Sequence, residues 1–88
     1  MVEKFFKVTD PTGIHARPAS LIVQAANNFK SEINIEFNNK KANLKSIMSV
    51  MALGIPQDAE IKIVVMGQDE TEAMDTLSDV FVRQKLAE

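Results

Sequence analysis

The sequence predicts an α+β fold in which one antiparallel or mostly antiparallel sheet is covered on one face by helices. Two observations predict it. Segments with apolar residues at every second position are interspersed with segments whose apolar residues recur every three or four positions, in the order β-α-β-β-α-β-α. Polar residues also line one side of the second strand, so the face of the sheet away from the helices is expected to be partly exposed to solvent.

The first predicted strand covers residues 3–8, where aromatic and β-branched residues mix with lysines before the turn-prone TDPTG at residues 9–13. A helix is expected over about residues 16–28, because apolar residues recur there at helical spacing. Pro18 falls in its first turn, where a missing backbone N–H costs nothing. His15 is then at or just before the N-terminus of this helix.

A hairpin is expected after this helix. Apolar and polar residues alternate over residues 31–37, as in a half-buried strand. Asn38 and Asn39 tolerate positive φ, so they can turn the chain into an antiparallel partner strand over residues 40–44.

The rest of the chain predicts a short helix, a strand and a longer helix. Ser46 as N-cap and Gly54 as C-terminal stop enclose a helix of about seven residues. Residues 60–66 form the fourth expected strand. Asp69 and Glu72 are expected to form a capping pair at the start of the last helix. The expected core stripe of that helix consists of Ala73, Met74, Leu77, Val80 and Phe81.

Composition limits the class of protein. With 88 residues, 45% hydrophobic and 25% charged, the chain is expected to form one globular domain over residues 1–88. The absence of cysteine excludes disulfides and cysteine-based metal centres. No stretch has the pattern of a signal peptide or approaches the roughly 20 apolar residues of a membrane span. A cytoplasmic protein without membrane insertion is therefore expected.

Charge is distributed unevenly along the chain. The net charge of −2 divides into +3 for residues 1–56, with seven Lys/Arg against four Asp/Glu, and −5 for residues 57–88, with three against eight. A net negative chain without tyrosine or tryptophan is a poor candidate for direct nucleic-acid binding, which needs a basic surface. Partners are expected to approach the positive half with acidic or apolar faces.

The only histidine, His15, lies in the stretch TGIHARPAS. One histidine without an acidic cluster does not supply the three ligands of a catalytic zinc, and no glycine-rich phosphate loop is present. A hydrolytic triad would need Ser20 or a remote serine, together with a carboxylate, to converge on His15, and no nucleophile-elbow motif supports that. The structural alternative is an exposed or capping histidine without chemistry.

The surroundings of His15 suit a phosphoryl group on the histidine itself. Neutral imidazole is a nucleophile near pH 7 and can attack a phosphoryl donor to form a phosphoramidate. The N–H groups at the helix start and the Arg17 guanidinium would then face the added anion. Gly13 removes bulk beside the site, and Pro18 stiffens the helix start.

Ser46 allows two interpretations. A serine at an N-cap is commonly structural, but a phosphate there would also be stabilised by the helix dipole. Ile47, Met48 and Met51 follow on a helix too short to hide every side chain, so they are expected to leave an apolar patch. The alternative is that either methionine side chain is buried and fills space in the core.

Two motifs resemble one family, the phosphocarrier protein HPr of the bacterial phosphoenolpyruvate-dependent sugar phosphotransferase system. GIHARPAS at residues 13–20 resembles its active-histidine signature, and KSIMSVMALG at residues 45–54 resembles the regulatory-serine signature of its Gram-positive, low-GC version. The resemblance extends over essentially all 88 residues. It implies an open-faced β-sandwich with a four-stranded antiparallel sheet and three helices on one face, whereas the residues alone leave the strand order open.

The resemblance also implies a function. His15 would accept a phosphoryl group on Nδ1 from phosphorylated enzyme I and pass it to the IIA domains of sugar permeases, with Arg17 stabilising the phosphate. Such a protein is a stoichiometric carrier rather than an enzyme, needs no cofactor or metal, and is expected to be a monomer. The residues expected to contact partners are Ala16, Ser20, Ile47, Met48 and Met51.

The second signature implies regulation. An HPr kinase/phosphorylase would phosphorylate Ser46, which would slow phosphorylation of His15 and let the protein act with catabolite control protein A in carbon catabolite repression. A related regulator, the catabolite repression homologue, lacks the active histidine, so His15 argues against that assignment. A regulatory binding module with a vestigial histidine and a small hydrolase stay open as alternatives.

Overall fold

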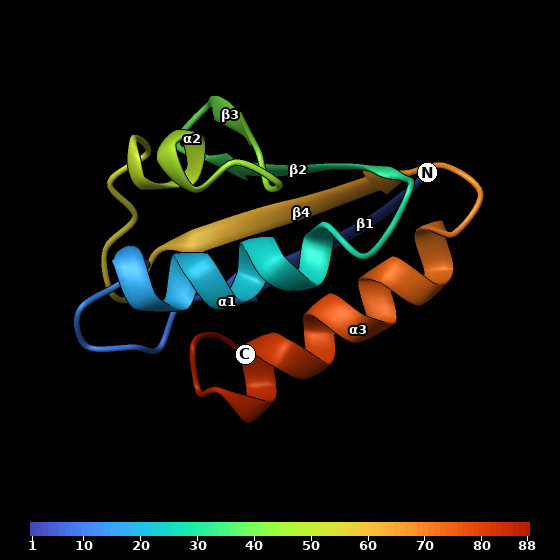
Figure 1. Ribbon diagram of the computed structural model, residues 1–88. Helices are drawn as coiled ribbons and strands as arrows, with labels where there is room; N and C mark the ends of the chain where they lie inside the picture. Colours follow the sequence, from blue (N-terminus) through green and yellow to red (C-terminus); the bar gives the residue numbers. More distant parts are fainter.

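The computed structural model describes all 88 residues as one four-stranded antiparallel sheet with three helices over one of its faces (Figure 1). The strands are β1 (Val2–Lys7), β2 (Glu32–Phe37), β3 (Lys40–Asn43) and β4 (Glu60–Met66). The helices are α1 (Ala16–Ala26), α2 (Ile47–Met51) and α3 (Glu70–Arg83). The predicted fold class and element order are confirmed, although α2 has five residues rather than about seven.

The strand order is β1-β4-β2-β3, which the sequence left open. β4 lies between β1 and β2 and is antiparallel to both. This central position explains why Ile61, Ile63 and Val65 are all buried. β2 and β3 form the predicted hairpin, and the two turn residues, Asn38 and Asn39, have φ of 53° and 65°. Their short polar side chains tolerate this left-handed conformation.

The core lies between the sheet and the helices. A cluster of 23 buried hydrophobic residues includes members of every strand and every helix. The Phe6 ring of β1 packs against the Phe81 ring of α3 with 4.7 Å between ring centroids. The predicted stripe of α3 faces this core, with Val80 only partly buried. Burial of this apolar surface is the main force that holds the helices to the sheet.

The other face of the sheet is open, as the alternation in β2 predicted. Lys62 lies on this face, with its Nζ 3.6 Å from carboxylate oxygens of both Glu3 and Glu36. The same Nζ lies 5.8 Å from the centroid of the exposed Phe5 ring. Ion pairs that stay in contact with water contribute little to stability, so the fold depends on the helix-covered face.

The start of α3 differs from the prediction. Asp69 is the N-cap residue, but its carboxylate makes no capping hydrogen bond in α3, and Glu72 is exposed. The Asp69 carboxylate instead accepts hydrogen bonds from the backbone N–H groups of Lys30, at 2.9 Å, and Ser31, at 3.0 Å, and from the hydroxyl of buried Ser31. The predicted capping pair is therefore wrong, because this carboxylate ties α3 to the segment that enters β2.

These contacts make stability depend on pH. The hydrogen bond from the Ser31 side chain, followed by those from the backbone, lowers the pKa of Asp69 below its ordinary 3.8. A carboxyl with a lower pKa in the folded protein stabilises the fold above its unfolded pKa, and this contribution is lost as the pH falls through the folded pKa.

We expect Asp69→Asn to lower Tm at neutral pH and to flatten the decline of Tm below about pH 4, because the titrating carboxylate is gone. Asp75→Asn, on the exposed side of α3, is the matched control and should follow the wild type. Thermal unfolding monitored by circular dichroism across the acid range measures both variants. Identical acid declines in all three proteins would contradict the role of Asp69.

Candidate functional site

His15 lies at the start of α1, as the sequence predicted. It is the N-cap residue with an extended backbone, and its carbonyl accepts the first helical hydrogen bond from the Ala19 N–H at 2.9 Å. Its imidazole is exposed and makes no capping hydrogen bond. The ring is therefore free to react with a group that arrives from solvent.

The backbone N–H groups of Ala16 and Arg17, the two residues after His15, are free donors. The first N–H groups of a helix have no partner within it, and neither of these two donates to another backbone carbonyl. Buried Pro18 follows as predicted and has no N–H. An anion at such a helix end gains about 0.3–1 kcal/mol, and about 2 kcal/mol where it is partly buried. Arg17 is exposed and can add its guanidinium.

Backbone hydrogen bonds to two distant carbonyls, those of Ile55 and Leu86, anchor the loop before His15. The Ile14 N–H donates to the Ile55 carbonyl at 3.0 Å, just beyond α2. The Thr9 N–H donates to the Leu86 carbonyl at 2.8 Å, near the C-terminus. Neither acceptor could be predicted from the sequence, because a backbone carbonyl that is distant in sequence leaves no signal in a local pattern.

Gly13 is required by the first of these anchors. Its φ is +71°, and a Cβ there would lie 2.3 Å from the Ile55 carbonyl oxygen and 2.9 Å from Cα of Pro56. The absent side chain would therefore collide with the backbone of residues 55–56. The structure assigns Gly13 to this close approach of two backbones, rather than to the free space beside the imidazole that the sequence suggested.

Asp10 is an acidic residue near the site, and no motif in the sequence pointed to it. Its Oδ1 accepts hydrogen bonds from the Thr12 hydroxyl at 2.7 Å and from the Thr12 N–H at 2.9 Å. These bonds lower the pKa of Asp10, and the charges of His15 and Arg17 contribute less. The carboxylate is thus ionised at neutral pH and shapes the turn before the histidine, instead of orienting the imidazole as a triad would require.

α1 and α2 lie side by side and run in opposite directions (Figure 1). The hydrogen bond to Ile55 joins the start of α1 to the end of α2. At the other end of α1, the Asn27 side chain donates to the Lys45 carbonyl at 3.2 Å. Lys45 Nζ in turn donates to the Phe29 carbonyl at 2.7 Å. The start of α2 therefore lies at the C-terminal end of α1.

Ser46 follows Lys45 and caps α2, as predicted. Its Oγ accepts a hydrogen bond from the Ser49 N–H at 3.3 Å, and the residue is half-buried. The eleven residues of α1 place its two ends about 16 Å apart. Ser46 and His15 thus lie at opposite ends of α1 and do not form one site. A change at Ser46 can therefore affect His15 only through a molecule or a structural element that contacts both residues.

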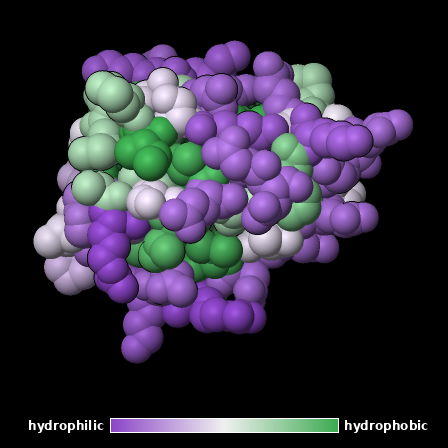
Figure 2. Space-filling model, viewed as in Figure 1, coloured by the Kyte–Doolittle hydropathy of each residue, from purple (hydrophilic) through white to green (hydrophobic).

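An apolar surface, the α2 patch, lies on the outside of α2 and consists of Ile47, Met48 and Met51. These side chains are 39%, 82% and 43% exposed, and Val50 is the one buried residue of α2. Figure 2 shows hydrophobic residues gathered over this part of the molecule. The predicted exposure is confirmed, and core filling is wrong for both methionines. Ala16 is exposed, whereas Ser20 is half-buried.

Other kinds of site find little support in the structure. No group of three or more His, Cys, Asp or Glu side chains is arranged to hold a metal ion. The one pocket lies on the open side of the sheet, lined by Phe5, Phe37, Lys62 and their neighbours, away from His15. None of the helices combines the length and apolar character that a membrane crossing requires.

Known proteins share this arrangement. The family model described as PTS HPr component phosphorylation site matches residues 2–83. The histidine-containing phosphocarrier protein of Mycoplasma is 39% identical over 97% of both chains, with a TM-score of 0.95. HPr of Thermoanaerobacter tengcongensis is 45% identical over 97% of this chain and 94% of its own, with a TM-score of 0.89. Crh, a catabolite repression protein of Bacillus subtilis with a swapped dimer, is 40% identical over 98% of both chains, with a TM-score of 0.74.

We expect Gly13→Ala to break the hydrogen bond between Ile14 and Ile55, because its Cβ would lie 2.3 Å from the Ile55 oxygen. The free energy of unfolding should fall by about 2–3 kcal/mol, from backbone strain and the lost hydrogen bond. Gly54→Ala is the matched control. Its φ is +62°, but a Cβ there meets nothing within 4 Å. That control should lose only about 1–2 kcal/mol. Urea unfolding measures both, and equal losses would rule out the contact as the reason for Gly13.

Proposed function

Because the chain belongs to the HPr family of the phosphotransferase system, we propose that it carries phosphoryl groups on His15, from phosphorylated enzyme I to the IIA domains of sugar permeases. One observation carries this proposal: the free imidazole of His15 stands at a helix start whose Ala16 and Arg17 N–H groups have no backbone acceptor. In this role residues 1–88 act as one cytoplasmic carrier domain, without cofactor or metal.

The chemistry follows from this arrangement. The lone pair of imidazole Nδ1 attacks phosphorus, and a P–N bond forms as the bond between phosphorus and the donor group breaks. The transferred group brings about −1.5 to −2 charges to the helix start, where the N–H groups and the Arg17 guanidinium accommodate them. Transfer to a IIA domain reverses these steps and restores the imidazole. The chain is thus a stoichiometric carrier rather than an independent enzyme.

Incubation with enzyme I and phosphoenolpyruvate should add the mass of one phosphate to the protein, and mild acid should remove it, because phosphoramidates are acid-labile. His15→Ala should show no gain, whereas Ser46→Ala should be modified like the wild type. Intact-mass spectrometry before and after acid measures this. Full modification of His15→Ala, with its circular dichroism spectrum unchanged, would contradict the proposal.

The same assay tests Arg17 against the only other arginine in the chain. Arg17→Ala should slow the initial rate on the order of tenfold, because the phosphate loses a permanently charged donor. Arg83→Ala should leave the rate unchanged, since Arg83 pairs with Asp79 on α3 at 2.9 Å. Equal phosphorylation rates for the two variants would show that Arg17 does not contribute to phosphoryl transfer.

We further propose that an HPr kinase/phosphorylase phosphorylates Ser46 and that this controls both the relay and, with catabolite control protein A, carbon catabolite repression. The position of Ser46 supports this, because it adjoins the α2 patch and follows Lys45, whose carbonyl accepts a hydrogen bond from Asn27 at the far end of α1 from His15. A partner that reacts with His15 while covering the α2 patch, Ala16 and Ser20 would meet the new phosphate at its edge. The added charge would repel an acidic partner.

Ser46→Asp should slow phosphorylation of His15 by enzyme I several-fold, on the order of 1 kcal/mol in association at low salt, and the effect should shrink as salt rises. Ser78→Asp makes the same charge change on α3, where Ser78 accepts a hydrogen bond from Lys4 Nζ at 3.2 Å. That control should react at the wild-type rate. Stopped-flow or quench-flow rates at two salt concentrations measure both, and equal slowing would show that net charge rather than position matters.

A regulatory binding module is the second candidate function, favoured by the 40% identity to Crh. The free imidazole at the start of α1 favours the carrier. The swapped dimer described for Crh is a property of that relative. We propose a monomer for this chain, because β1 is paired with β4 of the same chain from Val2 to Lys7.

A further inference from the structure

We propose that Met48 and Met51 form an oxidation-sensitive site, at which peroxide converts the thioethers to sulfoxides and thereby slows the relay through His15. This inference rests on the proposed function, because it takes the α2 patch as the docking surface for enzyme I. It adds a second, reversible modification to that surface, independent of Ser46.

The methionines of this chain differ sharply in exposure. Met74 is 4% exposed within the core, whereas Met48 is 82%, Met51 43%, Met66 47% and Met1 68% exposed. Oxidants in solution reach exposed thioethers first, so four of the five are accessible and one is protected. Two of the accessible ones, Met48 and Met51, lie in the α2 patch.

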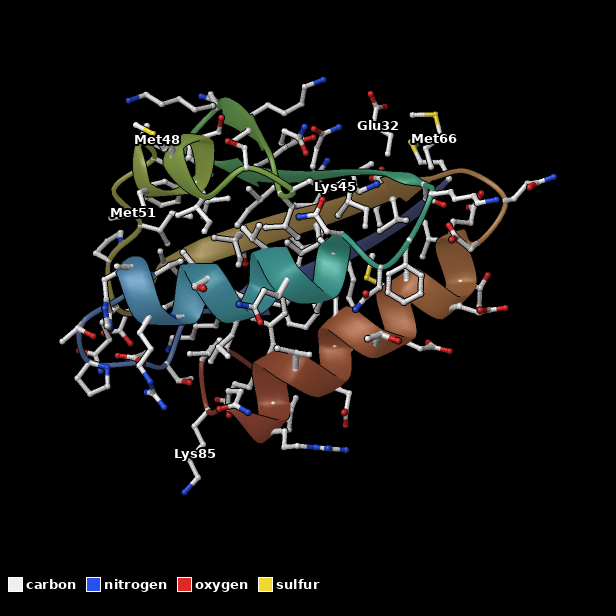
Figure 3. All side chains as sticks on the ribbon, viewed as in Figure 1. Glu32, Lys45, Met48, Met51, Met66 and Lys85 are labelled. Atoms are coloured by element: carbon white, nitrogen blue, oxygen red, sulfur yellow. The ribbon has the colours of Figure 1, made fainter.

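Met48 and Met51 are three residues apart, which places both on one side of α2. In Figure 3 both lie at the end of the molecule where α1 begins. Met51 is the last residue of α2, and its carbonyl accepts a hydrogen bond from the Gly54 N–H at 3.1 Å. The anchor of the histidine loop, Ile55, is the next residue after Gly54. Oxidation would therefore place new polar groups between Ser46 and the His15 end of α1.

The reaction is a two-electron oxygen transfer. A sulfur lone pair attacks one oxygen of hydrogen peroxide, and an S–O bond forms as the O–O bond breaks. The departing hydroxide takes the remaining proton and leaves as water. Sulfur loses two electrons and the peroxide gains two. The product carries a strong hydrogen-bond acceptor in place of an apolar, polarizable atom.

A sulfoxide at this position affects docking more than folding. Val50 is the only buried residue of α2, so the core does not depend on either exposed methionine. A partner that covers the α2 patch, however, would bury the S=O oxygens, which costs free energy unless it offers hydrogen-bond donors. Methionine sulfoxide reductases reverse the modification, so the effect is a switch rather than damage.

Met66 provides a control within the same molecule. Its exposure of 47% is close to the 43% of Met51. It lies at the end of β4, opposite Glu32 of β2, and Figure 3 shows it at the other end of the molecule from α2. Its oxidation should match that of Met51 in extent and leave the relay unaffected.

The test treats the whole protein with hydrogen peroxide until peptide mass spectrometry finds one added oxygen on Met48, Met51 and Met66 and none on Met74. Phosphorylation of His15 by enzyme I and phosphoenolpyruvate is then timed in treated and untreated samples. We expect the treated wild type to react about fivefold or more slowly. Methionine sulfoxide reductase should restore the rate, and the circular dichroism melting curve should stay unchanged.

Two variants locate the effect. In Met48→Leu/Met51→Leu the ratio of treated to untreated rate should be close to one, whatever its untreated rate. Met66→Leu should lose as much rate on treatment as the wild type. An oxidised wild type that is phosphorylated as fast as the untreated protein would overturn the inference. So would a double variant that loses as much rate on treatment as the wild type, or a treated wild type that is unfolded by circular dichroism. If the untreated protein takes up no phosphate, the proposed function itself fails and the inference with it.

Discussion

The close backbone contact between Gly13–Ile14 and residues 55–56 fixes where α1 begins relative to α2. It requires a residue without Cβ, because the Ile55 oxygen occupies the space that a side chain would need. With this contact in place, His15 is the N-cap of α1, its ring makes no capping hydrogen bond, and the next two N–H groups have no backbone acceptor. Main-chain packing thus places His15, while the helix itself supplies the N–H groups that we propose stabilise a phosphoryl group.

The opposite directions of α1 and α2 separate the two residues for which we propose phosphorylation. His15 and Ser46 lie at opposite ends of α1, and the exposed side chains of the α2 patch occupy the surface next to both. In the proposed relay a charge at Ser46 would act on the partner rather than on the imidazole, since a direct interaction along the length of α1 is largely screened in water. In the proposed function the same surface would serve both phosphoryl transfer and its control, and the exposed side chain of Met48 lies within it.

The sequence predicted the parts of this fold that local chemistry determines. Alternation placed β2 and β4, the Asn38–Asn39 pair placed the hairpin, and Ser46 was recognised as a helix cap. Long-range contacts could not be predicted from the sequence. The carboxylate of Asp69 accepts hydrogen bonds from Ser31 rather than within its own helix, and Gly13 faces the backbone of residues 55–56, which is distant in sequence. No local pattern encodes such partners, which also explains why the strand order had to come from the structure.

The central claim is that the Ala16 and Arg17 N–H groups hold a phosphoryl group on His15. Its most direct measurement is a proton–nitrogen correlation NMR spectrum of labelled protein before and after reaction with enzyme I and phosphoenolpyruvate, with phosphorus NMR to identify the phosphoramidate. The amide signals of Ala16 and Arg17 should move furthest downfield, those of α3 should stay in place, and mild acid should reverse the change. A phosphoramidate that leaves both amide signals unmoved would contradict the claim.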